Sequence, residues 1–155
     1  MATQVTLGSG VVSSAGSLKL QTNGTTDALT IDTSQNLGLG VTPSAWSSGK
    51  VLEIGNAGNA IWGNSTANFY LTENAYYNSG WKYASANGAA AYQMLTNSHA
   101  WSVSSGTPSA GSAITFTQAM TLDASGNLGV GTTSPNTTLH VQGSSQTDGS
   151  IDRKS

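Results

Sequence analysis

Residues 28–40 read Ala-Leu-Thr-Ile-Asp-Thr-Ser-Gln-Asn-Leu-Gly-Leu-Gly, and residues 119–131 read Ala-Met-Thr-Leu-Asp-Ala-Ser-Gly-Asn-Leu-Gly-Val-Gly. The two stretches start 91 positions apart, and eight of their thirteen aligned pairs are identical. Each alternates apolar and small polar residues up to the Asp, breaks at a polar turn, and then resumes with apolar residues at every second position. This pattern is typical of a strand, a tight turn and a second strand. A module that occurs twice predicts an elongated, segmented β protein.

The turn inside each repeat has a clear chemical basis in the second copy. Asp123 starts the turn and can accept backbone N–H groups, while Gly126 supplies a left-handed conformation. The first copy has Gln35 in place of Gly126, so its turn is expected to be slightly strained or of another type. No helical pattern follows the Gly-x-Gly of either copy. We therefore interpret these glycines as points of close chain approach and not as a nucleotide loop.

The composition predicts a folded β protein with a thin core. Ser, Thr, Asn and Gly make up 74 of the 155 residues, whereas Leu, Ile, Val and Phe make up 27. The formal net charge is only −2, and the alternating patterns are too regular for a solvated coil. Strands with so little apolar surface do not offset the cost of backbone ordering, roughly 1–2 kcal/mol per residue. We therefore expect an obligate homo-oligomer, in which partner chains supply the missing core.

The sparse charges exclude several classes of function. Charged residues are 8% of the chain, against about 25% in typical domains, so no basic stripe is available for nucleic acid. The chain has no cysteine and no apolar run that approaches the ~18 residues of a membrane-spanning helix. No secretory signal is visible at the N-terminus, and a protein of extracellular character without one fits a particle that is assembled in the cytoplasm and released by lysis. The hydroxyl- and amide-rich surface either hydrogen-bonds sugars or simply covers solvent-facing strand positions.

No catalytic, metal-binding or cofactor-binding residues are expected. His99 and His140 lack a suitably spaced carboxylate for zinc, and a Ser/His/Asp system can be composed from any chain this rich in Ser. A glycosidase needs two carboxylates, and the middle of the chain offers Glu73 with Glu53 upstream. We therefore predict that the protein is not an enzyme.

Nine of the eleven aromatic residues lie between Trp62 and Trp101. Aromatic rings stack on sugar faces, and they also replace aliphatic residues in a local core. Both interpretations are open for this block, with most rings expected in the core and a few exposed. The candidate glycan-binding or receptor-binding residues are Tyr76, Tyr77, Trp81 and Trp101.

Turn signals and apolar alternation divide the chain into five parts and predict no helix of more than two turns. We expect an N-terminal attachment segment, a β shaft module with the first repeat, an aromatic-rich antiparallel β domain, a shaft module with the second repeat, and a disordered C-terminal tail. The expected boundaries are 1–17, 18–44, 45–118, 119–143 and 144–155. The aromatic-rich part is expected to form a discrete bulge on a slender shaft.

The second repeat, continued through Gly-Thr-Thr-Ser-Pro135 and Leu139-His140-Val141, resembles bacteriophage tail-fibre and tailspike proteins. The similar region in that family precedes an endosialidase-type intramolecular chaperone. Trp81-Lys82-Tyr83 and the stretch 114–120 resemble the same lineage. The resemblance covers roughly residues 28–142 and implies a homotrimer of intertwined β chains, with no catalytic residues to carry over.

Together these observations predict an all-β, elongated homotrimeric fibre in the virion, which binds host cell-surface polysaccharide and joins other virion proteins through its N-terminal segment. No nucleic acid or membrane insertion is expected. The alternatives are a capsid-borne head fibre, a decoration or spacer protein without a receptor, and a polysaccharide depolymerase. The residues expected at the trimer interface are Ile31, Leu37, Leu39, Leu122, Leu128 and Val130.

Overall fold

The computed structural model describes residues 15–64, 68–106 and 108–143. These residues form thirteen β-strands and no helix, which confirms the predicted all-β class. The expected tail 144–155, and all of the expected attachment segment except residues 15–17, lie outside the described residues.

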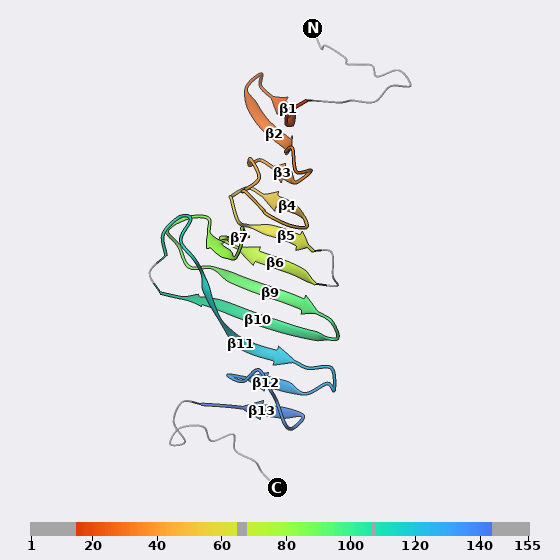
Figure 1. Ribbon diagram of the computed structural model, residues 1–155, viewed down its shortest axis with the longest axis vertical. Helices are drawn as coiled ribbons and strands as arrows, with labels where there is room; N and C mark the ends of the chain where they lie inside the picture. Colours follow the sequence, from red (N-terminus) through yellow and green to blue (C-terminus); the bar gives the residue numbers. More distant parts are fainter. Residues whose placement is uncertain (1–14, 65–67, 107, 144–155) are drawn as a thin grey trace.

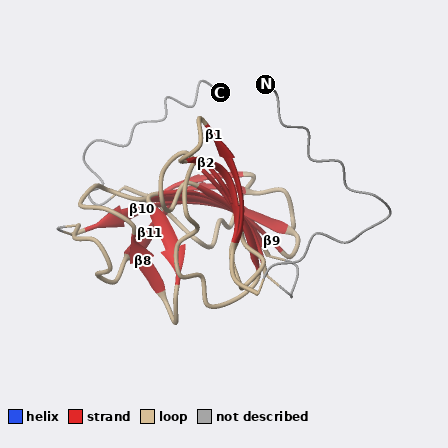
Figure 2. Cartoon of the chain, turned by 90° about the horizontal axis from the view of Figure 1, so that it is seen from above, coloured by secondary structure: helices blue, strands red, loops and turns tan. Residues whose placement is uncertain are grey.

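Eleven strands form one mixed sheet, stacked along the long axis of the molecule (Figure 1). Viewed down that axis, the strands lie behind one another (Figure 2). In sheet order they are β1 (Leu18–Thr22), β2 (Thr26–Ile31), β3 (Leu37–Leu39), β4 (Lys50–Ile54), β5 (Ala60–Gly63), β6 (Phe69–Glu73), β9 (Ala90–Leu95), β10 (Ser98–Ser105), β11 (Thr115–Leu122), β12 (Leu128–Val130) and β13 (Leu139–Val141).

The remaining two strands, β7 (Ala75–Tyr77) and β8 (Trp81–Tyr83), form a separate antiparallel hairpin beside the sheet. The chain leaves the sheet after β6 at Asn74, which has a φ of 53°. The Asn74 side chain donates hydrogen bonds to the carbonyl oxygens of Asn87 (2.7 Å) and Gly88 (3.1 Å). This buried amide turns the chain out of the sheet and into the hairpin.

The repeat is larger in the structure than in the sequence. Strands β1 to β4 pair antiparallel, antiparallel and parallel, and β10 to β13 repeat this order. Both units carry a register shift at the same place, after Leu20 in β1 and after Trp101 in β10. Opposite these shifts lie the equivalent residues Ala28 and Ala119, whose carbonyl oxygens accept the N–H groups of Gly40 and Gly131. The chain is therefore two four-stranded units with the strands β5 to β9 between them.

The two repeat turns are held by the same carboxylate. Oδ1 of Asp32 accepts the N–H groups of Ser34 and Asn36, both at 2.8 Å. Oδ1 of Asp123 accepts those of Ser125 (2.9 Å) and Asn127 (2.8 Å). The backbone N–H of Asn127, helped by its side chain and by the N–H groups of Ser125 and Gly126, holds the pKa of Asp123 below its usual value. The turns are thus of one type, contrary to the alternative that the first copy adopts another.

Gln35 takes the position of Gly126 with a φ of 66°, against 80° for the glycine. A left-handed conformation costs a residue with a Cβ about 1–2 kcal/mol. The strain expected in the first turn is therefore located at Gln35.

The first glycine of each Gly-x-Gly is required by close chain approach, as the sequence predicts. A Cβ on Gly38 would lie 2.0 Å from the carbonyl oxygen of Val41, and one on Gly129 would lie 2.7 Å from that of Thr132. In both copies the chain thus folds back over the strand that it has just left, before it enters the parallel strand β4 or β13.

The core lies on one side of the sheet. The hairpin β7–β8 and the connection 41–49 lie against this side, which we call the covered face. One cluster of buried side chains contains Trp46, Val51, Ala60, Trp62 and Tyr70, and the partly buried side chains of Tyr76, Tyr77, Trp81 and Leu95 pack against it. A second contains Ala75, Tyr83 and Ala89. Aromatic rings therefore take the place of aliphatic residues in this core, which is one of the two interpretations of the aromatic block.

Glu53 is fully buried on the covered face, with an exposed fraction of 0%. Its carboxylate accepts the N–H groups of Ser44 (2.7 Å) and Gly58 (2.8 Å) and the indole N–H of Trp46 (3.0 Å). Buried carboxylates are tolerated when such donors satisfy them. Glu53 thereby ties both connections that flank β4 to the sheet.

Residues 45–118, predicted as a separate domain, contribute strands β4 to β6, β9, β10 and the first part of β11 to the same sheet as the repeats. The expected boundary at residue 118 falls inside β11 (Thr115–Leu122). The hairpin β7–β8 is the part of this segment that stands outside the sheet.

Replacing Gln35 with glycine should stabilise the chain. The relief of left-handed strain, about 1–2 kcal/mol, outweighs the added backbone entropy of glycine, about 0.5–1 kcal/mol. Ser34→Gly is the matched control, because Ser34 lies in the same turn without a left-handed φ. Urea unfolding should give a gain of about 0.5 kcal/mol for Q35G and a loss for S34G; equal losses would contradict the assignment of strain to Gln35.

Glu53→Gln should destabilise the chain by about 2–3 kcal/mol. The new NH₂ group replaces one carboxylate oxygen and cannot accept a hydrogen bond, so at least one buried N–H donor loses its acceptor. Glu73→Gln is the matched control, since Glu73 is exposed at the end of β6 and the new amide keeps an acceptor oxygen at that position. Urea unfolding of the two variants at one protein concentration provides the measurement. Similar small losses for both would show that the Glu53 contacts contribute little.

Candidate functional site: an open apolar face

The side of the sheet opposite the covered face is apolar along its whole length. Side chains alternate between the two sides of a strand, so the register assigns each to a face. One row of cross-strand partners takes one residue from each of the eleven strands, and every member is apolar or aromatic. The row is Leu18, Ile31, Leu37, Leu52, Ile61, Leu71, Tyr92, Trp101, Met120, Val130 and Val141.

The positions beside this row are also largely apolar. They include Leu20, Leu29, Leu39, Ile54, Phe69, Met94, Val103, Leu122, Leu128 and Leu139. We call this side, with the row and these flanking residues, the open face. In the described strands, every leucine except Leu95 belongs to it. Its charged residues in those strands are Lys50 and Glu73, at opposite margins of the face.

Solvent reaches this face in the single chain. Leu20 is 59% exposed, Val103 51% and Leu139 52%. On the covered face, by contrast, Thr30 is 1% exposed. Monomeric soluble proteins rarely expose a contiguous apolar patch of more than a few hundred Å², and larger ones usually mark an interaction site. The open face is therefore the candidate functional site.

All six residues predicted at a trimer interface lie on the open face. Ile31, Leu37 and Leu39 come from β2 and β3, and Leu122, Leu128 and Val130 come from the equivalent strands β11 and β12. Sequence reasoning missed that the face continues through the middle of the chain, where Leu52, Ile61, Leu71 and Tyr92 occupy the same row. The signal was present as apolar alternation in each strand, but the register that aligns these strands is not visible in the sequence.

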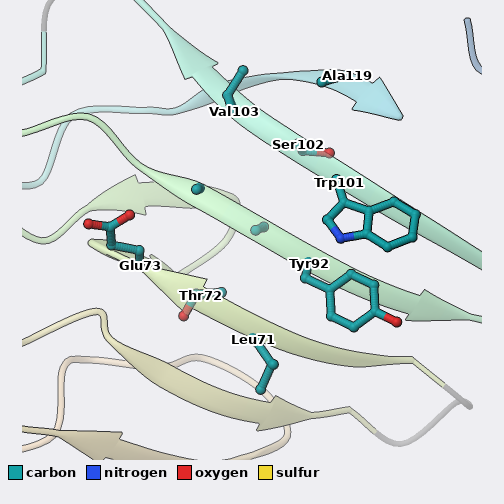
Figure 3. A pocket seen from close by; sticks show the side chains of 10 residues that line it. Leu71, Thr72, Glu73, Tyr92, Trp101, Ser102, Val103 and Ala119 are labelled. Atoms are coloured by element: carbon teal, nitrogen blue, oxygen red, sulfur yellow. The ribbon is translucent and has the colours of Figure 1, made fainter. Parts of the chain in front are cut away.

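The middle of the open face carries a hollow beside an aromatic ridge (Figure 3). The hollow has a volume of about 380 Å³. It lies over Ala90 and Ala91 of β9, with Leu71 and Glu73 of β6 on one side and Val103 of β10 on the other.

The aromatic ridge consists of Tyr92 and Trp101, which are cross-strand partners with ring centroids 5.0 Å apart. His99 stacks on Tyr92 at 5.9 Å, and its Nδ1 lies 2.7 Å from the Tyr92 hydroxyl. The ridge is thus a half-exposed stack of rings, while the neighbouring surface is recessed because alanine occupies its floor.

The four candidate glycan-binding residues do not gather at one place. Trp101 belongs to the ridge on the open face, whereas Tyr76, Tyr77 and Trp81 lie in the hairpin β7–β8 beside the covered face. Tyr77 stacks on Trp62 at 5.5 Å, and Trp81 meets the same ring edge-on at 5.4 Å. Tyr76 pairs across the hairpin with Lys82. The three hairpin rings are half-buried.

The described residues show no group of three or more His, Asp or Glu side chains that could hold a metal ion. His99 stacks within the ridge, and His140 lies on the covered side of β13, paired with Gly129. No helix in the described ranges is long and apolar enough to cross a membrane.

Comparison with known proteins identified no matching family model and no curated protein with significant similarity.

Proposed function

We propose that this chain is a segment of a bacteriophage fibre, assembled in the virion as a homotrimer through its open face. The observation that supports the proposal is the apolar row across all eleven strands, whose members are half-exposed or exposed in the single chain. Strands stacked across a long axis fit a fibre segment, because one continuous face then runs along that axis and identical chains can associate along it.

The open face has the size that a stable contact needs. Ten spacings of about 4.8 Å give the eleven-stranded sheet a length of about 50 Å. The strands of the sheet average about five residues, which at about 3.3 Å per residue gives a width of about 15 Å and a flat area on the order of 750 Å². A standard protein interface buries about 800 Å² per partner. Three copies with their open faces turned to a common axis bury these faces against one another and supply the core that one chain lacks.

A role in host attachment is the second part of the proposal. In such a trimer the covered face and its hairpin β7–β8 point outward, with Tyr76 and Lys82 on the hairpin. A half-exposed ring beside hydrogen-bonding side chains is a sugar-binding combination. The competing functions are a head fibre or decoration protein that binds no receptor, and a depolymerase; polysaccharide cleaved in the binding assay would identify the latter.

Leu39→Glu should dissociate the trimer, because a carboxylate would enter an apolar contact without a partner. Leu39 is 48% exposed in the single chain, so the substitution should leave the fold of the chain intact. The control is Thr25→Glu in the exposed turn between β1 and β2. Sedimentation equilibrium at micromolar concentration should give a trimer for the wild type and T25E, and a monomer for L39E. A folded wild-type monomer would refute the assembly.

Tyr76→Ala should weaken attachment to host cells about tenfold, roughly 1–2 kcal/mol, the scale of a lost aromatic contact. The trimer should stay intact, because Tyr76 lies away from the open face. Labelled protein binding to host cells, with and without their surface polysaccharide, provides the measurement. Attachment that is unchanged by Y76A, or that does not depend on the polysaccharide, would favour the spacer or decoration function.

A further inference from the structure

We propose that the aromatic ridge of one copy, Tyr92 and Trp101, inserts into the hollow over Ala90 of the next copy. The inference rests on the proposed trimer and names the contact that fixes its arrangement. Each copy then gives a ridge to one neighbour and a hollow to the other.

The ridge and the hollow lie side by side on the same strands. In β9, Tyr92 of the ridge is two residues from Ala90 of the hollow, and in β10 Trp101 is two residues from Val103. A step of two residues keeps both on the open face and moves about 7 Å along the strand. One lengthwise half of the face is therefore raised at this height, and the other half is recessed (Figure 3).

This asymmetry suits a threefold axis that runs along the stack of strands. When three copies turn their open faces to this axis, one lengthwise half of each open face lies against the opposite half of the open face of the next copy. Contacts of this kind are head-to-tail and close into a ring when the rotation allows it. Three identical ridges therefore meet three identical hollows at one height. A twofold axis that runs parallel to the strands at this height would instead place ridge against ridge.

The chemistry of the hollow matches an indole ring. Leu71 and Val103 offer apolar walls, and the volume of about 380 Å³ has room for a large side chain. A buried indole N–H normally finds an acceptor. Glu73 lines the hollow with an exposed carboxylate on the side away from the rings, where it can accept that bond from the neighbour's indole (Figure 3).

Disulfide trapping tests the contact, because the natural sequence has no cysteine. Ala90→Cys and Trp101→Cys chains, one carrying an affinity tag, are co-expressed and oxidised. We expect covalent dimers that contain one chain of each kind, and none from either variant alone. Links within one variant, or a trimer without mixed links, would overturn the proposal.

A second variant covers the case in which Trp101→Cys no longer assembles. Ala90→Leu fills the hollow and should raise the concentration at which the trimer dissociates at least tenfold, with an unchanged far-UV circular dichroism spectrum. Ala86→Leu, the same change at an exposed loop residue, should have no effect. A trimer that tolerates A90L as well as A86L would contradict the ridge-and-hollow contact alone, whereas a monomeric wild type would contradict the proposed assembly itself.

Discussion

The continuous apolar row on one side of the sheet is the constraint on which the rest of the structure depends. Hydrogen bonding between neighbouring strands aligns one apolar residue from each of the eleven strands, and no other segment of the described ranges lies over them. Water in contact with such a row is unfavourable at about 25 cal/mol per Å². The chain covers its other face with its own hairpin and connections, so the aliphatic surface is left for a partner.

The two four-stranded units show how few residues are needed to build this arrangement. An Asp closes the turn, one glycine lets the chain fold back over its strand, and the carbonyl group of a bulged alanine accepts the N–H of the second glycine. In the parallel strand of the two units, the buried Glu53 of β4 corresponds to His140 of β13. Glu53 binds three donors from the connections around it. This carboxylate therefore anchors the long aromatic insert to the first unit, a task that the second unit does not share.

The insert explains the unusual division of side chains. Its large rings pack on the covered face under the hairpin, where Trp62 contacts Tyr70, Tyr77 and Trp81. Rings fill volume with few side chains, and the Thr, Ala and Ser residues between them let the connections approach the sheet closely. The aliphatic residues of the strands therefore lie mainly on the open face. A chain so poor in Leu, Ile and Val forms a core on one side and keeps an interaction surface on the other.

The sequence by itself determined the all-β class, the paired strand–turn–strand modules, the close approach at Gly38 and Gly129, and the six apolar residues that now lie on one face. These follow from local chemistry: alternation, turn residues and the space around a glycine. Only the tertiary structure decided that the middle of the chain continues the sheet of the repeats, because strand register is set by contacts between residues far apart in the sequence. The same register separated Trp101 from Tyr76, Tyr77 and Trp81 and placed it beside the hollow over Ala90. Alternation says that two residues lie on opposite sides of one strand; which side meets the core depends on what the rest of the chain lays against it.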